Sequence, residues 1–139
     1  MGQKIELACI IDDDKIYVNL VKKIIEIKHL SENLLIFKNG LEALDYFKVI
    51  LTNMTEEKLP DIIFLDLNMP VMDGWEFLGE FIKIKNNFDK KITLYVVSSS
   101  IDPRDLERAK SFNLVTDYLI KPIELKKFEQ IFDTNKKVA

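Results

Sequence analysis

The sequence has few of the residues that cross-link a fold covalently or bind a soft metal. Of its 139 residues one is cysteine, Cys9, and one is histidine, His29. A lone cysteine excludes an intramolecular disulfide framework and fits a reducing compartment. Because its neighbours are apolar, we expect Cys9 to be a small buried hydrophobic residue and not a reactive thiol. The chain also lacks the paired Cys or His ligands that a zinc site requires.

Long apolar runs and a strong charge of one sign are missing as well. No run approaches the roughly 20 apolar residues that span a bilayer, and residues 1–4 lead into a strand pattern without the apolar region of a signal peptide. The net charge is -3, which argues against general nucleic-acid binding by this chain. We therefore expect a cytoplasmic protein that works on neither a membrane nor a nucleic acid.

Nothing in the composition divides the chain into parts. Apolar residues make up 47% and charged residues 31%, which is ordinary for a globular protein, and no linker, repeat or low-complexity stretch interrupts the pattern. The chain is long enough to bury a core without covalent cross-links. We predict one domain over residues 1–139, with its core at about 4–134 and a polar tail at 135–139.

Strand-like and helix-like patterns alternate along the chain. Helical spacing follows each of five short apolar runs, with Asp14 and Asn39 as predicted caps of the first two helices. This alternation predicts an α/β domain with a parallel sheet, right-handed crossovers and helices on both faces. The predicted strands are residues 5–11, 34–37, 62–65, 92–97 and 115–120.

The first helix carries apolar residues at helical spacing. Its predicted apolar face is formed by Ile16, Leu20, Ile24 and Ile27, with Val21 and Ile25 beside it. The last helix is predicted to bury residues between 123 and 132.

The most informative stretch is residues 66–74, Asp-Leu-Asn-Met-Pro-Val-Met-Asp-Gly. A continuous apolar run at 62–65, typical of a strand buried on both faces, delivers Asp66 directly into this stretch. Pro70 and the Asp73-Gly74 pair are turn signals. Asp66 is therefore expected at the carboxyl end of the strand, which is where open α/β sheets bind ligands.

Other strands end in polar groups too. The first runs into Asp12, Asp13 and Asp14, the fourth ends in three serines that begin at Ser98, and the fifth ends in Lys121-Pro122. Because the carboxyl ends of parallel strands share one edge of a sheet, these groups are expected to meet there.

Clustered carboxylates repel one another, and a divalent cation relieves that repulsion. Oxygen ligands without paired Cys or His favour Mg²⁺ over Zn²⁺. A carboxylate beside Mg²⁺ can attack phosphorus to form an aspartyl-phosphate. The cation, the Lys121 ammonium and the Ser98 hydroxyl would then stabilise the oxygens of the transferred phosphoryl group.

These motifs resemble the receiver domains of two-component response regulators, and the resemblance covers essentially the whole chain. The matching pieces are residues 11–14, 66–74, 98–100 and 121–122. The resemblance implies a flavodoxin-like sheet of order 2-1-3-4-5 with five helices. It also implies a signalling switch that assists its own phosphorylation and dephosphorylation, and not an enzyme with an external substrate.

Carried over to this sequence, the resemblance makes Asp66 the phosphoacceptor. Asp13 would bind Mg²⁺ directly and Asp12 mainly through water, while Asp66 and the backbone carbonyl of Asn68 would supply further ligands. Ser100 and Asn68 match positions that tune the lifetime of the phosphate.

The resemblance also assigns the switch. Ser98 matches the switch hydroxyl, Lys121 the lysine that pairs with the phosphoryl group, and Tyr118 the aromatic whose rotamer reports activation. Movement of Ser98 towards the phosphate would vacate space into which Tyr118 turns. Pro122 is expected to follow a cis peptide bond.

The implied partners are a histidine kinase or a histidine phosphotransfer protein as donor, and an unidentified downstream protein as target. Residues 104–110 form a charged helix that is either a partner surface or a solvated face. His29 lies far from the predicted site and is expected to be an ordinary exposed residue. The chain contains no pattern for an output domain, and it is either complete or the excised receiver of a longer regulator.

Two other functions compete with this interpretation. A receiver-like scaffold could bind partners without phosphorylation, although the presence of Asp13, Asp66, Ser98 and Lys121 argues against it. A Mg²⁺-dependent phosphohydrolase of the haloacid dehalogenase type would carry a second acid two residues after the nucleophile, where this chain has Asn68.

Overall fold

The computed structural model describes residues 2–3 and 5–138. Five long strands and five α-helices alternate within these residues, and two short strands lie near the chain ends. In chain order the elements are β1 (Gly2–Gln3), β2 (Ile5–Ile11), α1 (Lys15–Ile27), β3 (Ser31–Phe37), α2 (Gly40–Asn53), the 3-10 helix η1 (Glu56–Lys58), β4 (Ile62–Asp66), α3 (Gly74–Lys85), β5 (Thr93–Ser98), α4 (Pro103–Lys110), β6 (Val115–Ile120), α5 (Leu125–Thr134) and β7 (Lys137–Val138).

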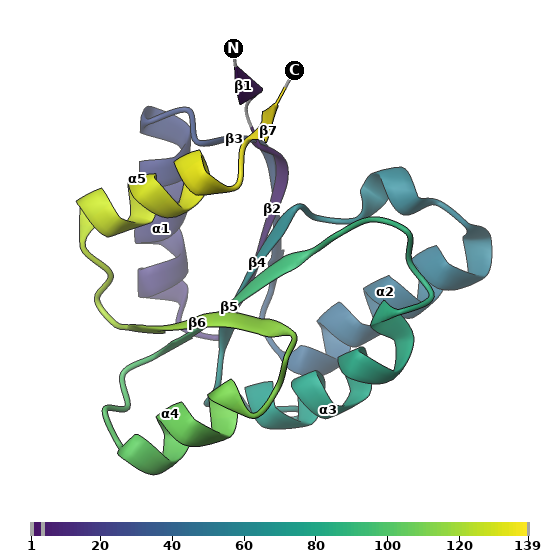
Figure 1. Ribbon diagram of the computed structural model, residues 1–139. Coiled ribbons are helices and arrows are strands. Elements are labelled where there is room, and N and C mark those ends of the chain that lie inside the picture. Colours follow the sequence, from purple (N-terminus) through teal and green to yellow (C-terminus); the bar gives the residue numbers. More distant parts are fainter. Residues whose placement is uncertain (1, 4, 139) are drawn as a thin grey trace.

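The long strands form one parallel sheet in the order β3-β2-β4-β5-β6. Counting from β2, this is the predicted order 2-1-3-4-5. Helices α1 and α5 cover one face, and α2, α3 and α4 lie on the other side (Figure 1). The predicted flavodoxin-like α/β fold is confirmed.

Two apolar layers hold the helices on the sheet. Val21 and Ile25 of α1 and Phe132 of α5 are buried in the first layer, against the β2 and β4 side chains that face them. On the other face Phe47 of α2 contacts Phe81 of α3 at 4.9 Å between ring centroids. All of β4 is buried, so its last residue enters the site from a rigid support.

The predicted apolar face of α1 is wrong at three of its four residues; Ile24 packs against the core. Ile16, Leu20 and Ile27 are 84%, 56% and 71% exposed, whereas Val21 and Ile25 are 6% and 2% exposed. The helix carries apolar residues on two adjoining stripes, so its periodicity alone does not decide which stripe faces the sheet. The stripe that is buried follows the spacing i, i+3 and i+7 from Val18.

The predicted helix caps are confirmed. A carboxylate oxygen of Asp14 accepts hydrogen bonds from the backbone N–H groups of Ile16 and Tyr17, both at 3.1 Å. The side chain of Asn39 accepts one from the N–H of Glu42 at 2.9 Å. These bonds satisfy N–H groups that have no partner within the first helical turn.

Strand β3 and the C-terminus differ from the predictions. β3 begins at Ser31, because the backbone of Ile5 in β2 pairs with this polar segment. The expected polar tail contains β7, whose Lys137 and Val138 pair antiparallel with Gln3 and Gly2. Backbone pairing supplied by a neighbouring strand leaves no apolar pattern in the sequence. The predicted bounds at residues 1, 4 and 139 lie outside the described residues.

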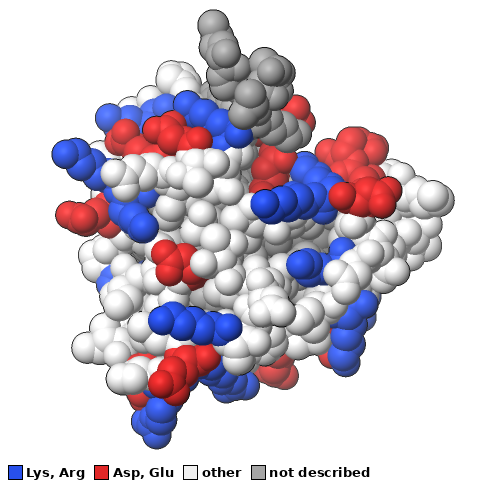
Figure 2. Space-filling view, viewed as in Figure 1, with Lys and Arg blue, Asp and Glu red and all other residues white. Residues whose placement is uncertain are grey.

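Opposite charges are interspersed on the surface shown in Figure 2, in keeping with the small net charge of -3. None of the helices in the described part of the chain combines the length and the apolarity that a bilayer span requires.

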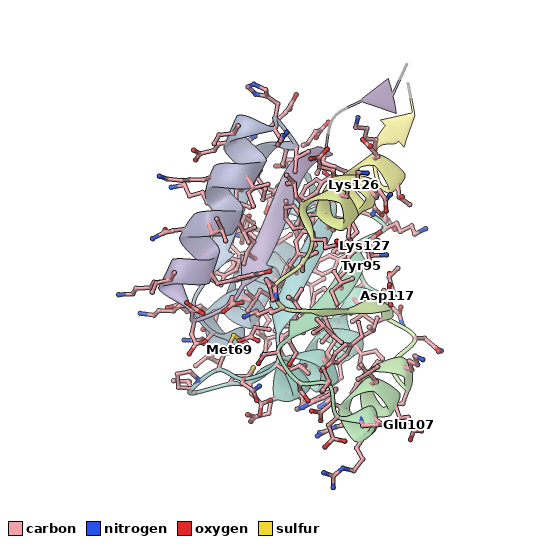
Figure 3. All side chains as sticks on the ribbon, turned by 90° about the vertical axis from the view of Figure 1, so that its left-hand side faces the viewer. Met69, Tyr95, Glu107, Asp117, Lys126 and Lys127 are labelled. Carbon is pink, nitrogen blue, oxygen red and sulfur yellow. The ribbon has the colours of Figure 1, made fainter. Side chains whose placement is uncertain are left out.

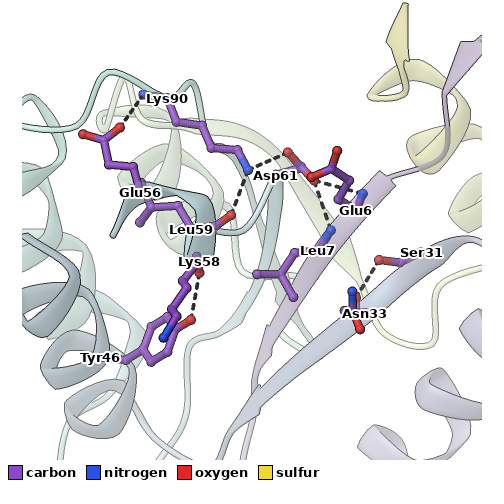
Figure 4. A network of polar contacts seen from close by, with 10 residues as sticks. All are labelled: Glu6, Leu7, Ser31, Asn33, Tyr46, Glu56, Lys58, Leu59, Asp61 and Lys90. Carbon is purple, nitrogen blue, oxygen red and sulfur yellow. Dashed lines mark hydrogen bonds and ion pairs between the residues drawn. The ribbon is translucent and has the colours of Figure 1, made fainter. Parts of the chain in front are cut away.

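A partly buried ion pair joins three segments at the amino end of the sheet (Figure 4). Asp61 accepts hydrogen bonds from the N–H groups of Glu6 and Leu7 of β2, both at 3.1 Å. Its carboxylate is also 2.8 Å from the Lys90 ammonium, which donates to the carbonyl of Leu59 at 2.8 Å. The start of β4 is thereby tied to β2 and to the segment before β5.

Candidate functional site

The predicted site residues lie at the carboxyl edge of the sheet. Asp12 follows β2 directly, Asp66 and Ser98 are the last residues of β4 and β5, and Lys121 follows β6. Figure 3 shows Met69, in the loop after β4, at this same end and away from β1 and β7. Parallel pairing therefore collects residues that are far apart in the sequence.

Three carboxylates meet at this edge. Asp12, Asp13 and Asp66 each place one oxygen so that the three atoms lie within 4.8 Å of one another. Asp12 and Asp66 are 3% and 6% exposed, whereas Asp13 is exposed to solvent. Buried and exposed carboxylate oxygens in this arrangement fit a hard divalent cation.

Lys121 is the cation that faces these acids. Its Nζ atom lies 2.7 Å from Asp12 Oδ2 and 3.6 Å from Asp66 Oδ1. It also lies 4.3 Å above the centroid of the Tyr17 ring, a contact that the sequence analysis missed because it depends on how α1 leaves the loop after β2. The Lys121–Pro122 peptide bond is cis, as the resemblance implied.

Burial and neighbouring charges perturb Asp66. Burial raises the pKa of its carboxyl to about 6, and the charges of Asp12 and Asp13 add to the rise, while the charge of Lys121 and a hydrogen bond from the Leu67 backbone N–H oppose it. Burial and the charges of Asp12, Asp66 and Asp14 also raise the pKa of the Tyr17 hydroxyl. The protein groups alone therefore leave this site with too much negative charge for its environment.

The loop after β4 holds Asp66 against the start of α3. The N–H of Gly74 donates to the carbonyl of Leu67 at 3.0 Å. A Cβ atom at Gly74 would lie 2.4 Å from the carbonyl oxygen of Asp66 and 2.8 Å from Leu67 Cα. Asp73 and Glu76 cap α3 reciprocally. The Asp73-Gly74 turn signal thus marks a position where the backbone approaches too closely for a side chain.

The loop after β5 connects the predicted switch residues. Ser98 is fully buried, and its Oγ accepts a hydrogen bond from the N–H of Ser100 at 3.1 Å. The carbonyl of Ser100 accepts one from the Tyr118 hydroxyl at 2.9 Å. The Ser100 hydroxyl donates to Asp105 of α4 at 2.6 Å. Ser100 therefore contacts Ser98, Tyr118 and α4, a role that its place in the sequence did not reveal.

A family model for the response regulator receiver domain matches residues 8–133. The chain belongs to this family.

Relatives of this receiver domain include whole proteins of different length. The sensor histidine kinase CheAY of Helicobacter pylori is 35% identical over 112 residues, which are 81% of this chain and 13% of that kinase. The response regulator Rcp1 of Synechocystis sp. is 30% identical over 122 residues, 87% of this chain and 80% of that protein. The chain thus spans a small part of the first relative and most of the second.

Solved structures of response regulators have the same fold as this chain. A two component response regulator from Cytophaga hutchinsonii superimposes with a TM-score of 0.83 at 28% identity, covering 96% of this chain and 98% of that one. The Mn²⁺-bound form of response regulator Rcp1 superimposes with a TM-score of 0.66 at 28% identity, covering 93% of this chain and 90% of that one.

Other predicted residues of the receiver domain lie outside this cluster. Asn68 is exposed beside Asp66. His29 is exposed and follows the far end of α1, whose first turn lies at the site. The charged helix α4 presents Glu107 on its outer side (Figure 3), while Ala109 is fully buried.

Proposed function

We propose that this receiver domain is a phosphorylation switch in which Asp66 accepts a phosphoryl group from a phosphohistidine. The observation that carries the proposal is the buried Asp66 carboxylate, which lies with Asp12 and Asp13 and 3.6 Å from the Lys121 ammonium. An oxygen of Asp66 would form the new O–P bond while the P–N bond breaks and the imidazole leaves.

Asp12, Asp13, Asp66 and the backbone carbonyl of Asn68 are the proposed ligands of Mg²⁺. Bound there, the ion would neutralise the carboxylates and the phosphoryl oxygens. Two observations support this assignment: burial and the neighbouring acids raise the pKa of Asp66, and the related regulator Rcp1 has been crystallised in a Mn²⁺-bound form.

Lys121 and Ser98 would hold the transferred group. Lys121 already lies between Asp12 and Asp66, so its ammonium can pair with a phosphoryl oxygen without leaving the site. Ser98 would turn its hydroxyl towards the same oxygens and release the N–H of Ser100. Because Ser100 also binds Tyr118 and Asp105, this change would reach β6 and α4 as a population shift between two states.

The same proposal includes the phosphoryl donor, the target and the cellular location. The donor is a histidine kinase or a histidine phosphotransfer protein, the target is another protein, and the domain acts in the cytoplasm as a switch without an external substrate. This part of the proposal rests on membership of the receiver-domain family.

Intact mass after incubation with acetyl phosphate, with and without Mg²⁺, tests the phosphoryl transfer. We expect one phosphoryl adduct that requires Mg²⁺ and is lost in Asp66→Asn and Asp13→Asn. Asp14→Asn is the matched control, because Asp14 caps α1 and lies outside the carboxylate cluster. A folded protein that forms no adduct would contradict the proposal and favour the scaffold. Steady release of phosphate from a phosphomonoester would favour the hydrolase.

A further inference from the structure

A groove opens beside the carboxylates on the side of α1. It has a volume of about 640 Å³ and runs between α1, the end of β3 and the loop after β4. Such a volume fits a small organic molecule. We call it the α1 groove. Its apolar lining is formed by Val18, Ile36, Pro70 and Val71.

Several lining residues keep apolar surface in contact with water. Ile36 is 42% exposed and Val71 is 74% exposed. Val71 has a φ of 75°, a backbone conformation that is unfavourable for a β-branched residue. The loop thus holds an apolar side chain outward at the groove.

The charges around the groove favour an anion. Lys15, Lys22 and Lys38 line it, and at one end it includes Asp12 and Asp13. The lysines would attract a negatively charged molecule, while the carboxylates need a cation between them and that molecule. An occupant with an apolar body and a phosphoryl head matches this arrangement when the proposed Mg²⁺ is bound.

We propose that the α1 groove holds the acyl chain of a small acyl phosphate, so that donors with about six carbons phosphorylate Asp66 at lower concentration than acetyl phosphate does. This inference rests on the proposed function. An oxygen of Asp66 forms the O–P bond, the bond between phosphorus and the acyl oxygen breaks, and the carboxylate leaves with the electron pair. The groove contributes binding of the chain and takes no part in the bond changes.

The test compares hexanoyl phosphate with acetyl phosphate as donors in Mg²⁺, with adduct formation measured by intact mass. Both donors release similar carboxylates, so a difference in half-saturating concentration reports binding of the chain. Four additional methylene groups, partly buried, should lower that concentration about tenfold. The maximal rate should stay within about twofold, because the apolar lining of the groove binds the chain and not the reacting atoms.

Two variants connect the effect to the groove. Ile36→Ser should remove the preference for hexanoyl phosphate while leaving phosphorylation by acetyl phosphate unchanged. Val71→Asn should have the same effect. It should also preserve the backbone conformation of the loop, because Asn tolerates positive φ. Ile27→Ser is the matched control, since Ile27 is 71% exposed on α1 and does not line the groove.

The outcomes separate this inference from the proposed function. Phosphorylation of Asp66 with equal half-saturation by both donors would overturn the groove assignment and leave the switch intact. Loss of the preference in the Ile27→Ser control would also overturn it. Sedimentation of a wild-type dimer that Ile36→Ser converts to a monomer would assign the groove to a second copy of the chain and overturn the proposal. Absence of phosphorylation by either donor would contradict both.

Discussion

At the scale of single residues, the site contains buried ionisable side chains, and burying each of them alone would be unfavourable. Asp66 is buried with two other acids, and Lys121 lies closer to Asp12 than to Asp66. The raised pKa of Asp66 reflects this environment. A carboxylate that is costly to ionise without a cation gains strongly when a cation arrives, which links stability, metal binding and phosphorylation at one residue.

The pKa of Asp66 predicts how stability depends on pH in EDTA. Folding raises this pKa from 3.8 to about 6, so protonation of Asp66 favours the folded state. This contribution to the free energy of unfolding is fully present below pH 3.8 and is lost as pH rises through about 6. Asp66→Asn should therefore become more stable than wild type by up to about 3 kcal/mol above pH 7, with no advantage gained from ionisation below pH 4. Urea unfolding across this range measures the difference. A difference that stays constant at all pH values would contradict the prediction.

Gly74 and Gly79 form a matched pair in α3. A Cβ at Gly74 would collide with the backbone of Asp66 and Leu67, whereas one at Gly79 would meet nothing within 4 Å. Gly74→Ala should cost about 3 kcal/mol and slow phosphorylation of Asp66. Gly79→Ala should stabilise the protein by about 0.5–1 kcal/mol, because alanine favours a helix interior. Urea midpoints of both variants test this, and equal effects would refute it.

At the scale of elements, the strand ends were predictable, and so was the buried side of α5, where Phe128, Ile131 and Phe132 are buried. The buried face of α1 was not. Asp66, Ser98 and Lys121 each follow an apolar strand pattern directly. The sequence therefore locates all three correctly at one edge of the sheet. Helix α1 has two competing apolar stripes, and the choice between them depends on the sheet and on α5. The link from Ser100 to Asp105 likewise depends on how the loop folds.

The corrected face of α1 makes a stability prediction. Ile25 is 2% exposed and packs against the sheet, while Ile27 is 71% exposed. Ile25→Ala should lower the free energy of unfolding by about 3 kcal/mol, through lost burial and a cavity. Ile27→Ala should change it by less than about 0.5 kcal/mol. Chemical denaturation distinguishes the two variants, and the reverse order would restore the face predicted from the sequence.

At the scale of the whole molecule, the two edges of the sheet differ in how their charged side chains are paired. The carboxyl edge gathers three acids near Lys121, whereas the amino edge pairs buried Asp61 with Lys90 and backbone N–H groups. The first edge can gain from a cation, and the second holds three segments together. The alternation of strands and helices predicted a parallel sheet with helices on both faces, and the family resemblance implied its strand order. Asp61 and Lys90 carry no pattern that pairs them in the sequence.

Breaking the amino-edge pair should affect stability without affecting the switch. Lys90→Met would remove the ammonium 2.8 Å from Asp61 while the N–H groups of Glu6 and Leu7 still donate to the carboxylate, at a cost of about 1.5–3 kcal/mol. Phosphorylation of Asp66 by acetyl phosphate should be unchanged in the folded variant, because the pair lies at the opposite end of β4. Lys91→Met, a change at an exposed neighbour, is the control and should shift stability by less than about 0.5 kcal/mol. A loss of phosphorylation in folded Lys90→Met would refute this separation.

The ribbon of β1 and β7 brings Gly2 beside Val138, at the end of the sheet away from the site (Figure 1). A backbone whose two ends already meet can be closed into a ring by a short linker and reopened elsewhere. The exposed turn at Met54, between α2 and η1, is a suitable place for new ends. A circular permutant cut there would carry fused proteins beside η1 while its phosphorylation edge kept the same neighbours.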